Sequence, residues 1–182
     1  MNMLETHFRW FGGRLIFDFC NTVLIHPESE LELLETEEDL RRWFAHIGYE
    51  NILITPQILS DLIALRNELR NVFELLLEKE NQGVEALNGL LAKYQTNLQI
   101  RCKENSCQIQ YFSEKEAQGI LLSELLKVFE KIELKRIKTC YNKRCFHFFY
   151  DVSKANRRKW CDMDSCGNKM KAKRFYERKK NG

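Results

Sequence analysis

Four cysteines near the C-terminus limit what this chain can fold into more than any other feature. They form two pairs, Cys140 with Cys145 and Cys161 with Cys166, and each pair encloses four residues. Two short knuckles joined by a folded segment can bring four thiolates to the corners of a tetrahedron, which is the coordination that Zn²⁺ prefers, with sulfur about 2.3 Å from the metal. Charged residues inside both loops argue against a role in a hydrophobic core. The spacing therefore predicts a closed zinc site with these four ligands.

Length and composition indicate a compact chain without a membrane segment. The chain has 182 residues and 44% apolar residues, enough for one core and a small appendage. No run approaches the roughly 20 apolar residues of a membrane span. The first residues lack the apolar block of a secretion signal, so we expect a cytoplasmic protein with no membrane partner. The odd number of cysteines, seven, favours reduced thiols and metal binding over a disulfide framework.

Charge divides the chain into two parts. Residues 135–182 contain 16 Lys or Arg against 4 Asp or Glu, whereas residues 1–134 contain 13 against 22. A basic module joined to an acidic body is typical of nucleic-acid-binding proteins. The alternative is a basic segment that docks on the acidic part. We expect one domain in residues 1–134 and a second in residues 135–182.

Helix signals follow one another in the acidic part. Thr36 can cap a helix over residues 37–47, with acidic residues in its first turn. Thr55 followed by proline is a stronger start, for a long helix that ends near residue 81. We expect Gly83 to separate this helix from a shorter one. The predicted fold class is mainly α with a small β-hairpin (α+β).

The predicted hairpin covers residues 98–112, which alternate around the turn KENS. Cys102 and Cys107 in this hairpin repeat the spacing of the zinc ligands. Two thiolates alone make a poor zinc site, so we expect a reduced pair facing each other across the hairpin, with a redox role as the alternative. Ser113 opens a further helix through a capping box, and we expect that helix to run on to the metal site.

Residues 7–25 form a dense apolar block with apolar residues at helical spacing. We expect a helix here, with a strand as the alternative because of the β-branched and aromatic content, followed by a connector over residues 27–35. Asp18 and Asn21 are the conspicuous polar residues of the block. Burying them without partners would cost a few kcal/mol. They therefore either form internal hydrogen bonds or line a pocket.

The cysteine-rich segment predicts a treble-clef-like zinc finger. Residues 146–150 form a short apolar strand that can cover the metal, and Gly167 lets the backbone turn tightly beside it. We expect Asn168 to cap the final helix and Phe175 with Tyr176 to pack on the finger. The finger has few apolar residues, so the metal would be its core.

The end of the chain carries the candidate nucleic-acid contacts. The final helix has seven cationic residues and a single acid, Glu177, so its charge is not balanced internally. A solvated charged face is the alternative. The candidate contacts are the cations of the loop and the helix: Lys154, Arg157, Arg158, Lys159, Lys169, Lys171, Lys173, Arg174 and Arg178.

The quoted motifs resemble two known families. The finger is similar to the CGNR zinc finger family in a set of shared positions, which are Phe149, Asp151, Ser153, Asn156, Arg158, Trp160, Cys161, Met163, Cys166, Gly167, Asn168, Lys171 and Ala172. The block GGRLIFDFCNTV resembles the ABATE domain of bacterial stress-induced transcriptional regulators. The family's final Arg is Lys169 here, which keeps the charge but loses the planar two-pronged donor.

This resemblance implies a bacterial transcription regulator that binds DNA through its finger, with residues 1–134 sensing a ligand or mediating dimerisation. It also makes Gly13, Asp18, Asn21 and Thr22 candidates for a ligand pocket. A homodimer would fit palindromic DNA sites. The alternatives are a structured-RNA-binding zinc protein, or a small-molecule-binding protein whose finger is an interaction module. We expect no enzymatic activity, because four thiolates leave zinc no open position and no catalytic motif occurs.

Overall fold

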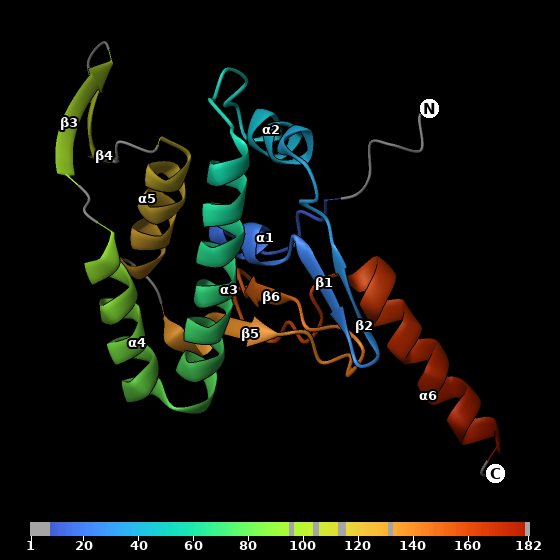
Figure 1. Cartoon of the computed structure of the whole chain (residues 1–182). Coiled ribbons are helices and arrows are strands. Elements are labelled where there is room, and N and C mark those ends of the chain that lie inside the picture. Colours follow the sequence, from blue (N-terminus) through green and yellow to red (C-terminus); the bar gives the residue numbers. More distant parts are fainter. Residues whose placement is uncertain (1–7, 95–96, 104–105, 113–115, 131–132, 181–182) are drawn as a thin grey trace. The chain divides into compact units, whose positions relative to one another are not determined.

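The computed structural model describes residues 8–94, 97–103, 106–112, 116–130 and 133–180 (Figure 1). It confirms the fold class, since helices predominate and the sheets are three antiparallel strand pairs. The chain forms two compact units. One joins residues 1–33 to residues 133–182 and is called the finger unit here, and the other, residues 34–132, is called the helical unit. Residues 1–33 thus belong to the finger unit, whereas the charge pattern placed the whole of residues 1–134 in one domain.

The helical unit begins with two capped helices, as the sequence predicts. The Thr36 hydroxyl accepts a hydrogen bond from the Asp39 N–H, and the Asp39 carboxylate accepts one from the Thr36 N–H. The Thr55 hydroxyl accepts one from the Ile58 N–H at 3.3 Å. The elements of this unit are α2 (Glu37–His46), α3 (Pro56–Glu78), α4 (Glu80–Lys93), β3 (Asn97–Lys103), β4 (Ser106–Phe112) and α5 (Glu116–Glu130).

Apolar stripes at helical spacing form the core of this unit. Helix α3 contacts both α2 and α4, and α5 contacts β4. The buried apolar side chains of α2 and α3 are Leu40, Trp43, Phe44, Leu62, Leu65, Leu69, Val72, Phe73 and Leu76. Among the described residues, no helix is long and apolar enough to cross a bilayer.

The prediction that Gly83 separates two helices is wrong. The break lies at Lys79, whose extended backbone ends α3, and Gly83 lies inside α4. A Cβ atom at Gly83 would lie 2.5 Å from the Leu76 Cα atom. Glycine is therefore required by the close approach of α4 to α3, and not by a turn.

The hairpin of β3 and β4 is confirmed, and its register places Cys102 opposite Cys107. The capping box at Ser113 lies outside the described residues. The prediction that the following helix runs on to the metal site is wrong, because α5 ends at Glu130. A 3₁₀ turn (Leu134–Arg136) and the short strand β5 (Ile137–Thr139) precede the first cysteine instead.

The finger unit contains a hairpin that the sequence analysis missed. Helix α1 (Leu15–Cys20) ends earlier than its apolar spacing suggests, and β1 (Val23–His26) pairs with β2 (Ser29–Glu32) where we expected a connector. The run Val-Leu-Ile favours a strand, and Pro27 with Glu28 forms the turn. The remaining elements are β6 (Phe148–Tyr150), a π turn (Met163–Gly167) and α6 (Asn168–Lys180).

Two glycines of α4 provide a matched test of its packing. Replacing Gly83 by alanine should destabilise the protein by about 1–3 kcal/mol, since the new methyl group meets the backbone of α3. Nothing lies within 4 Å of a Cβ atom at Gly89, so Gly89→Ala should stabilise by about 0.5–1 kcal/mol. Urea unfolding of both variants measures the difference, and equal effects at the two positions would contradict the packing described here.

Candidate metal centre and the segment that completes it

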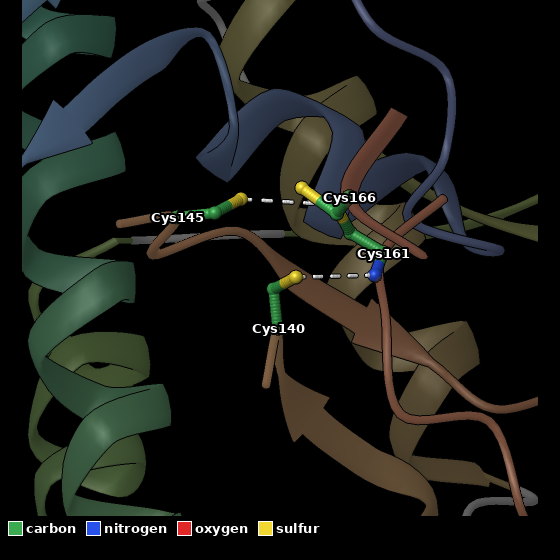
Figure 2. Close-up of side chains that lie close together, drawn as sticks. All are labelled: Cys140, Cys145, Cys161 and Cys166. Carbon is green, nitrogen blue, oxygen red and sulfur yellow. Dashed lines mark hydrogen bonds between the residues drawn. The ribbon is translucent and has the colours of Figure 1, made fainter. Parts of the chain in front are cut away.

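The four predicted zinc ligands converge (Figure 2). Their sulfur atoms all lie within 4.8 Å of one another. The Cys161 sulfur lies 3.7 Å from that of Cys145 and 3.8 Å from that of Cys166. A tetrahedron with metal–sulfur bonds of about 2.3 Å has edges of about 3.8 Å, so these two distances match those of a bound zinc ion and the whole set lies close to that spacing.

Backbone hydrogen bonds hold the first knuckle in place. The Cys140 N–H donates to the His147 carbonyl at 2.9 Å, which extends the pairing of β5 and β6 by one residue. The Cys145 N–H donates to the Asn142 carbonyl at 2.7 Å and closes the loop. The Tyr141 N–H donates to the Lys159 carbonyl at 2.8 Å, which ties the first knuckle to the loop that leads into the second.

The second knuckle is closed by Asp162. Its carboxylate accepts a hydrogen bond from the Ser165 N–H at 2.6 Å, and its carbonyl accepts one from the Gly167 N–H at 3.0 Å. The prediction that Asn168 caps the final helix is therefore wrong, because Asn168 already has helical backbone angles. A Cβ atom at Gly167 would lie 2.5 Å from the sulfur of Met163, an exposed and flexible side chain that would have to move.

The sulfur atoms perturb one another's protonation. Hydrogen bonds with Cys145 and Cys161 lower the pKa of Cys140 to about 2. The same contact with Cys140 raises the pKa of Cys145 to about 12, and contact with Cys140 also raises that of Cys161. Sulfur atoms this close cannot all carry charge unless a cation joins them. A divalent metal would displace the shared protons, which is how thiolate sites bind zinc.

Two donors outside the cysteine side chains point at the sulfur atoms. The Cys161 N–H donates to the Cys140 sulfur, and the Asn142 side-chain amide donates to the Cys166 sulfur, each at 3.5 Å. Such outer contacts fix the orientation of metal ligands. The Phe149 side chain is fully buried against Cys140, Cys161 and Cys166, so the apolar strand does cover the cluster, as the sequence predicts.

The N-terminal motif completes the finger unit through Asn21. Its side-chain amide donates to the Phe148 carbonyl at 2.8 Å, and its side-chain oxygen accepts from the Phe148 N–H at 2.9 Å. Asn21 thus pairs with β6 as a neighbouring strand would, although 127 residues separate the two. Next to it, the buried Thr22 hydroxyl donates to the Phe19 carbonyl at 2.8 Å. Both side chains therefore form internal hydrogen bonds.

The glycine pair of the motif lies against the same strand. The Tyr150 N–H donates to the Gly12 carbonyl at 2.7 Å. Gly13 has φ of +71°, and a Cβ atom there would lie 2.7 Å from the Tyr150 carbonyl oxygen. The Gly12 N–H in turn donates to the Asp18 carboxylate at 2.6 Å. Glycine is required at position 13 on both counts, left-handed backbone and close approach.

Arg158 joins the N-terminal segment to the second knuckle. Its guanidinium donates to the carbonyls of Trp160 at 2.9 Å and Phe11 at 2.8 Å, and also to the carbonyl of Cys161. It lies over the Phe149 ring, 4.5 Å from the centroid. This side chain is committed to the fold. The hydrogen bonds of its Nε and Nη2 atoms thus give Arg158 a structural role that the sequence analysis, which grouped it with the candidate contacts, did not foresee.

Asp151 organises the loop that carries the other candidate contacts. Its buried carboxylate accepts hydrogen bonds from the Lys138 ammonium at 2.7 Å and from the N–H groups of Ser153 and Arg158. Burial opposes its ionisation, but these hydrogen bonds outweigh that effect and lower the pKa of Asp151. Asn156, in the same loop, has φ of +49°, which asparagine tolerates well. The loop is therefore a fixed structure whose exposed cations, Lys154, Arg157 and Lys159, point outward from it.

A cavity of about 380 Å³ lies in the finger unit beside the metal centre. None of the four predicted pocket residues, Gly13, Asp18, Asn21 and Thr22, lines it. Its position was not predicted from the sequence because it depends on the missed hairpin of β1 and β2. The lining residues are Arg9, Leu24, Ile25, His26, Pro27, Glu28, Ser29, Asn142, Arg144, Cys145, His147, Ser165, Cys166 and Lys169.

Asp18 should make stability depend on pH. Burial raises the pKa of Asp18 from 3.8 to about 6, against the opposing effects of the Gly12 hydrogen bond and the Arg158 charge. Between these two values the unfolded chain is ionised while the folded chain keeps the proton, so stability falls as pH rises from about 4 to 6. Asp18→Asn keeps an oxygen acceptor for Gly12 and removes this penalty. The variant should be more stable than the parent by up to about 3 kcal/mol at pH 7.5 and little different at pH 4.5.

Urea unfolding of parent and variant across this range measures the difference, in which other titrating groups cancel. Glu30→Gln is the matched control, since it removes an exposed carboxylate of the same unit. A variant less stable than the parent at pH 7.5 would contradict the assigned burial effect.

Comparison with known families divides the chain into two segments. The comparison with curated proteins finds no match. Residues 136–179 match the model of the CGNR zinc finger, and residues 13–108 match the model of the ABATE family, described as "Putative stress-induced transcription regulator". Both resemblances noted in the sequence are thereby confirmed, in the same order along the chain. The second match covers more than half of the chain, which therefore belongs to the ABATE family and carries a CGNR zinc finger.

Proposed function

We propose that this protein is a transcription regulator that binds DNA through helix α6 and the basic loop of its finger unit. The observation that carries the proposal is the exposure of α6. None of its 13 residues is buried, and seven of them are Lys or Arg. The prediction that its aromatic residues pack on the finger is wrong, since Phe175 and Tyr176 are 54% and 69% exposed.

The rest of the finger unit contributes few stabilising contacts to α6. The only ion pair within it joins Lys173 to Glu177 at 3.8 Å, with both side chains more than half exposed. Like charges on successive turns repel one another, and a polyanion relieves that repulsion. An α-helix fits the major groove of DNA, where lysine and arginine meet phosphates and base edges. Lys154, Arg157 and Lys159 of the basic loop add three exposed cations to the same unit.

The metal in this proposal is zinc, held by Cys140, Cys145, Cys161 and Cys166. Zinc bound by four thiolates supplies structural cross-linking and has no coordination position open for a substrate. For this reason we propose a structural metal and no enzymatic activity. The roles assigned to residues 1–134, ligand sensing or dimerisation, and a cytoplasmic location stay predictions.

Zinc content and chelation test the metal centre. The purified protein should contain one zinc ion per chain by elemental analysis, and Cys161→Ser should lower that content. A strong chelator should then raise hydrogen exchange in residues 137–168 and also in residues 12–22, since Asn21 and Gly12 pair with β6. Helix α3, in the other compact unit, should keep its protection. Exchange that rises in the cysteine segment alone would contradict the shared unit.

Salt dependence tests the nucleic-acid contacts. If about six cations meet phosphates, the logarithm of the affinity for duplex DNA should fall with log salt at a slope of about −5. Neutralising three exposed cations of α6, in Lys171→Gln with Lys173→Gln and Arg174→Gln, should reduce the magnitude of that slope by about 2–3. The matched control neutralises three cations of the helical unit, Arg41, Lys79 and Lys93, for the same change in net charge.

The readout is fluorescence anisotropy of labelled duplex DNA at several salt concentrations. Equal effects of the two triple variants would show that α6 makes no specific contribution. Competition with a folded RNA decides between DNA and the RNA-binding alternative. The RNA-binding alternative is favoured if folded RNA displaces DNA completely at equal nucleotide concentration while DNA does not displace the RNA.

A further inference from the structure

Two of the four cysteines line the cavity beside the metal centre. Cys145 and Cys166 line it, whereas Cys140 and Cys161 do not. Of the four, Cys145 alone is half-buried, and the other three are buried. Any small reagent that enters this cavity therefore meets the Cys145 side chain more readily than the other three. The Cys161 sulfur is 3.7 Å from the Cys145 sulfur.

The cavity is also cationic. Arg9, Arg144 and Lys169 line it, and within the residues that the structure describes none of the three forms an ion pair. Glu28 is the carboxylate in the lining. Cations around a cavity raise the local concentration of small anions.

The buried Cys161 differs from the other cysteines in the hydrogen bonds of its sulfur atom. The Cys140 sulfur accepts a hydrogen bond from the Cys161 N–H, and the Cys166 sulfur accepts one from Asn142. Within the described residues, the hydrogen bonds of the Cys161 sulfur run only to other sulfur atoms. A thiolate without N–H donors keeps more electron density for attack. Cys161 is therefore placed to react with an oxidised Cys145 but is shielded from the oxidant itself.

We propose that Cys145 is a site of oxidative modification, reached through this cavity by small two-electron oxidants such as hydrogen peroxide or hypochlorite. The Cys145 thiolate attacks one oxygen of the peroxide. A sulfur–oxygen bond forms, the oxygen–oxygen bond breaks, and hydroxide leaves. The Cys161 thiolate then attacks the Cys145 sulfur, so that a disulfide forms and a second hydroxide leaves. Two electrons pass from the sulfur atoms to the peroxide.

Hypochlorite follows the same course through chlorine. The Cys145 thiolate attacks the chlorine atom of the hypochlorite anion, the oxygen–chlorine bond breaks, and the oxygen takes a proton from water and leaves as hydroxide. Cys161 then displaces chloride to form the same disulfide. In both cases the metal loses two of its four ligands and dissociates.

This inference rests on the proposed zinc centre and links it to the nucleic-acid helix. Helix α6 begins two residues after Cys166, and its first turn is held by the knuckle that Asp162 closes. Release of the metal would loosen that knuckle. The oxidised protein should therefore lose most of its affinity for nucleic acid, and reduction with added zinc should restore it.

The first test maps the oxidised residues in the zinc-loaded full chain. One equivalent of peroxide is added under anaerobic conditions, zinc release is followed with a metallochromic dye, and peptides are mapped by mass spectrometry. Trypsin separates Cys145 from Cys161, and cleavage before Asp162 separates Cys161 from Cys166. The expected first product is the Cys145–Cys161 disulfide, formed at the rate of zinc release. A first product at Cys140 or Cys166, or a Cys102–Cys107 disulfide with zinc retained, overturns the proposal.

The second test blocks the cavity without touching a ligand. Ile25 lines the cavity on β1, so Ile25→Trp should slow oxidation of Cys145 about tenfold, in line with the dependence of thiol reactivity on access. Leu31→Trp is the matched control, because Leu31 is an exposed residue of the same hairpin that does not line the cavity. Both variants must keep one equivalent of zinc. Equal rates in the two variants overturn the role of the cavity.

The third test addresses charge. Arg144→Gln should slow the reaction with hypochlorite about twofold to fivefold and leave that with neutral peroxide nearly unchanged, with Lys143→Gln as control. A protein purified without zinc that cannot be loaded would refute the zinc centre of the proposed function. A zinc-loaded protein that is oxidised elsewhere refutes only the inference drawn here.

Discussion

The convergence of four sulfur atoms from two knuckles is the constraint on which the finger unit depends. The apolar side chains that pack on the cluster are few, chiefly the buried Phe149 and the partly buried Trp160. Burying such side chains stabilises a fold by about 1.5–3 kcal/mol each. Structural zinc contributes about 10–16 kcal/mol in comparable peptides. A bound zinc ion would therefore outweigh the local apolar contacts, and the backbone hydrogen bonds of the knuckles would serve mainly to keep the sulfur atoms close together.

The segment that matches the zinc finger family nevertheless does not satisfy all of its own backbone hydrogen bonds. The family models divide the sequence between residues 108 and 136, yet the polar groups of β6 find partners at Gly12 and Asn21. A strand edge left without partners inside a fold costs the desolvation of each backbone group. The N-terminal motif removes that cost, and Arg158 adds a second connection to it. The motif is thus better described as part of the finger unit than as the start of a separate domain.

The sequence predicted those features that depend on neighbouring residues. Helix caps at Thr36 and Thr55 follow from a hydroxyl three positions before its donor, and the zinc ligands follow from a repeated spacing. It could not place Asn21 on β6, because nothing in the local pattern of either segment reports a contact across 127 residues. For the same reason Gly83 was taken for a break when its role lies in packing on Leu76. Arg158 was grouped with surface cations because composition does not show which arginine meets carbonyl groups.

Helix α6 has a sequence that does not favour a stable helix on its own. A helix of 13 residues is marginal on its own, and repulsion among seven cations weakens it further. The contacts that oppose this repulsion lie within the helix itself, where the Phe175 and Tyr176 rings meet at 5.7 Å and the Lys179 ammonium lies 4.9 Å from the Phe175 centroid. Among the described elements, its main contact is with the π turn (Met163–Gly167) that carries Cys166. Under the proposed function, the order of the helix would depend on a polyanion along its length and on the metal next to its first turn. Loss of the metal would then weaken binding of the polyanion, and the polyanion would in turn stabilise the metal-bound form.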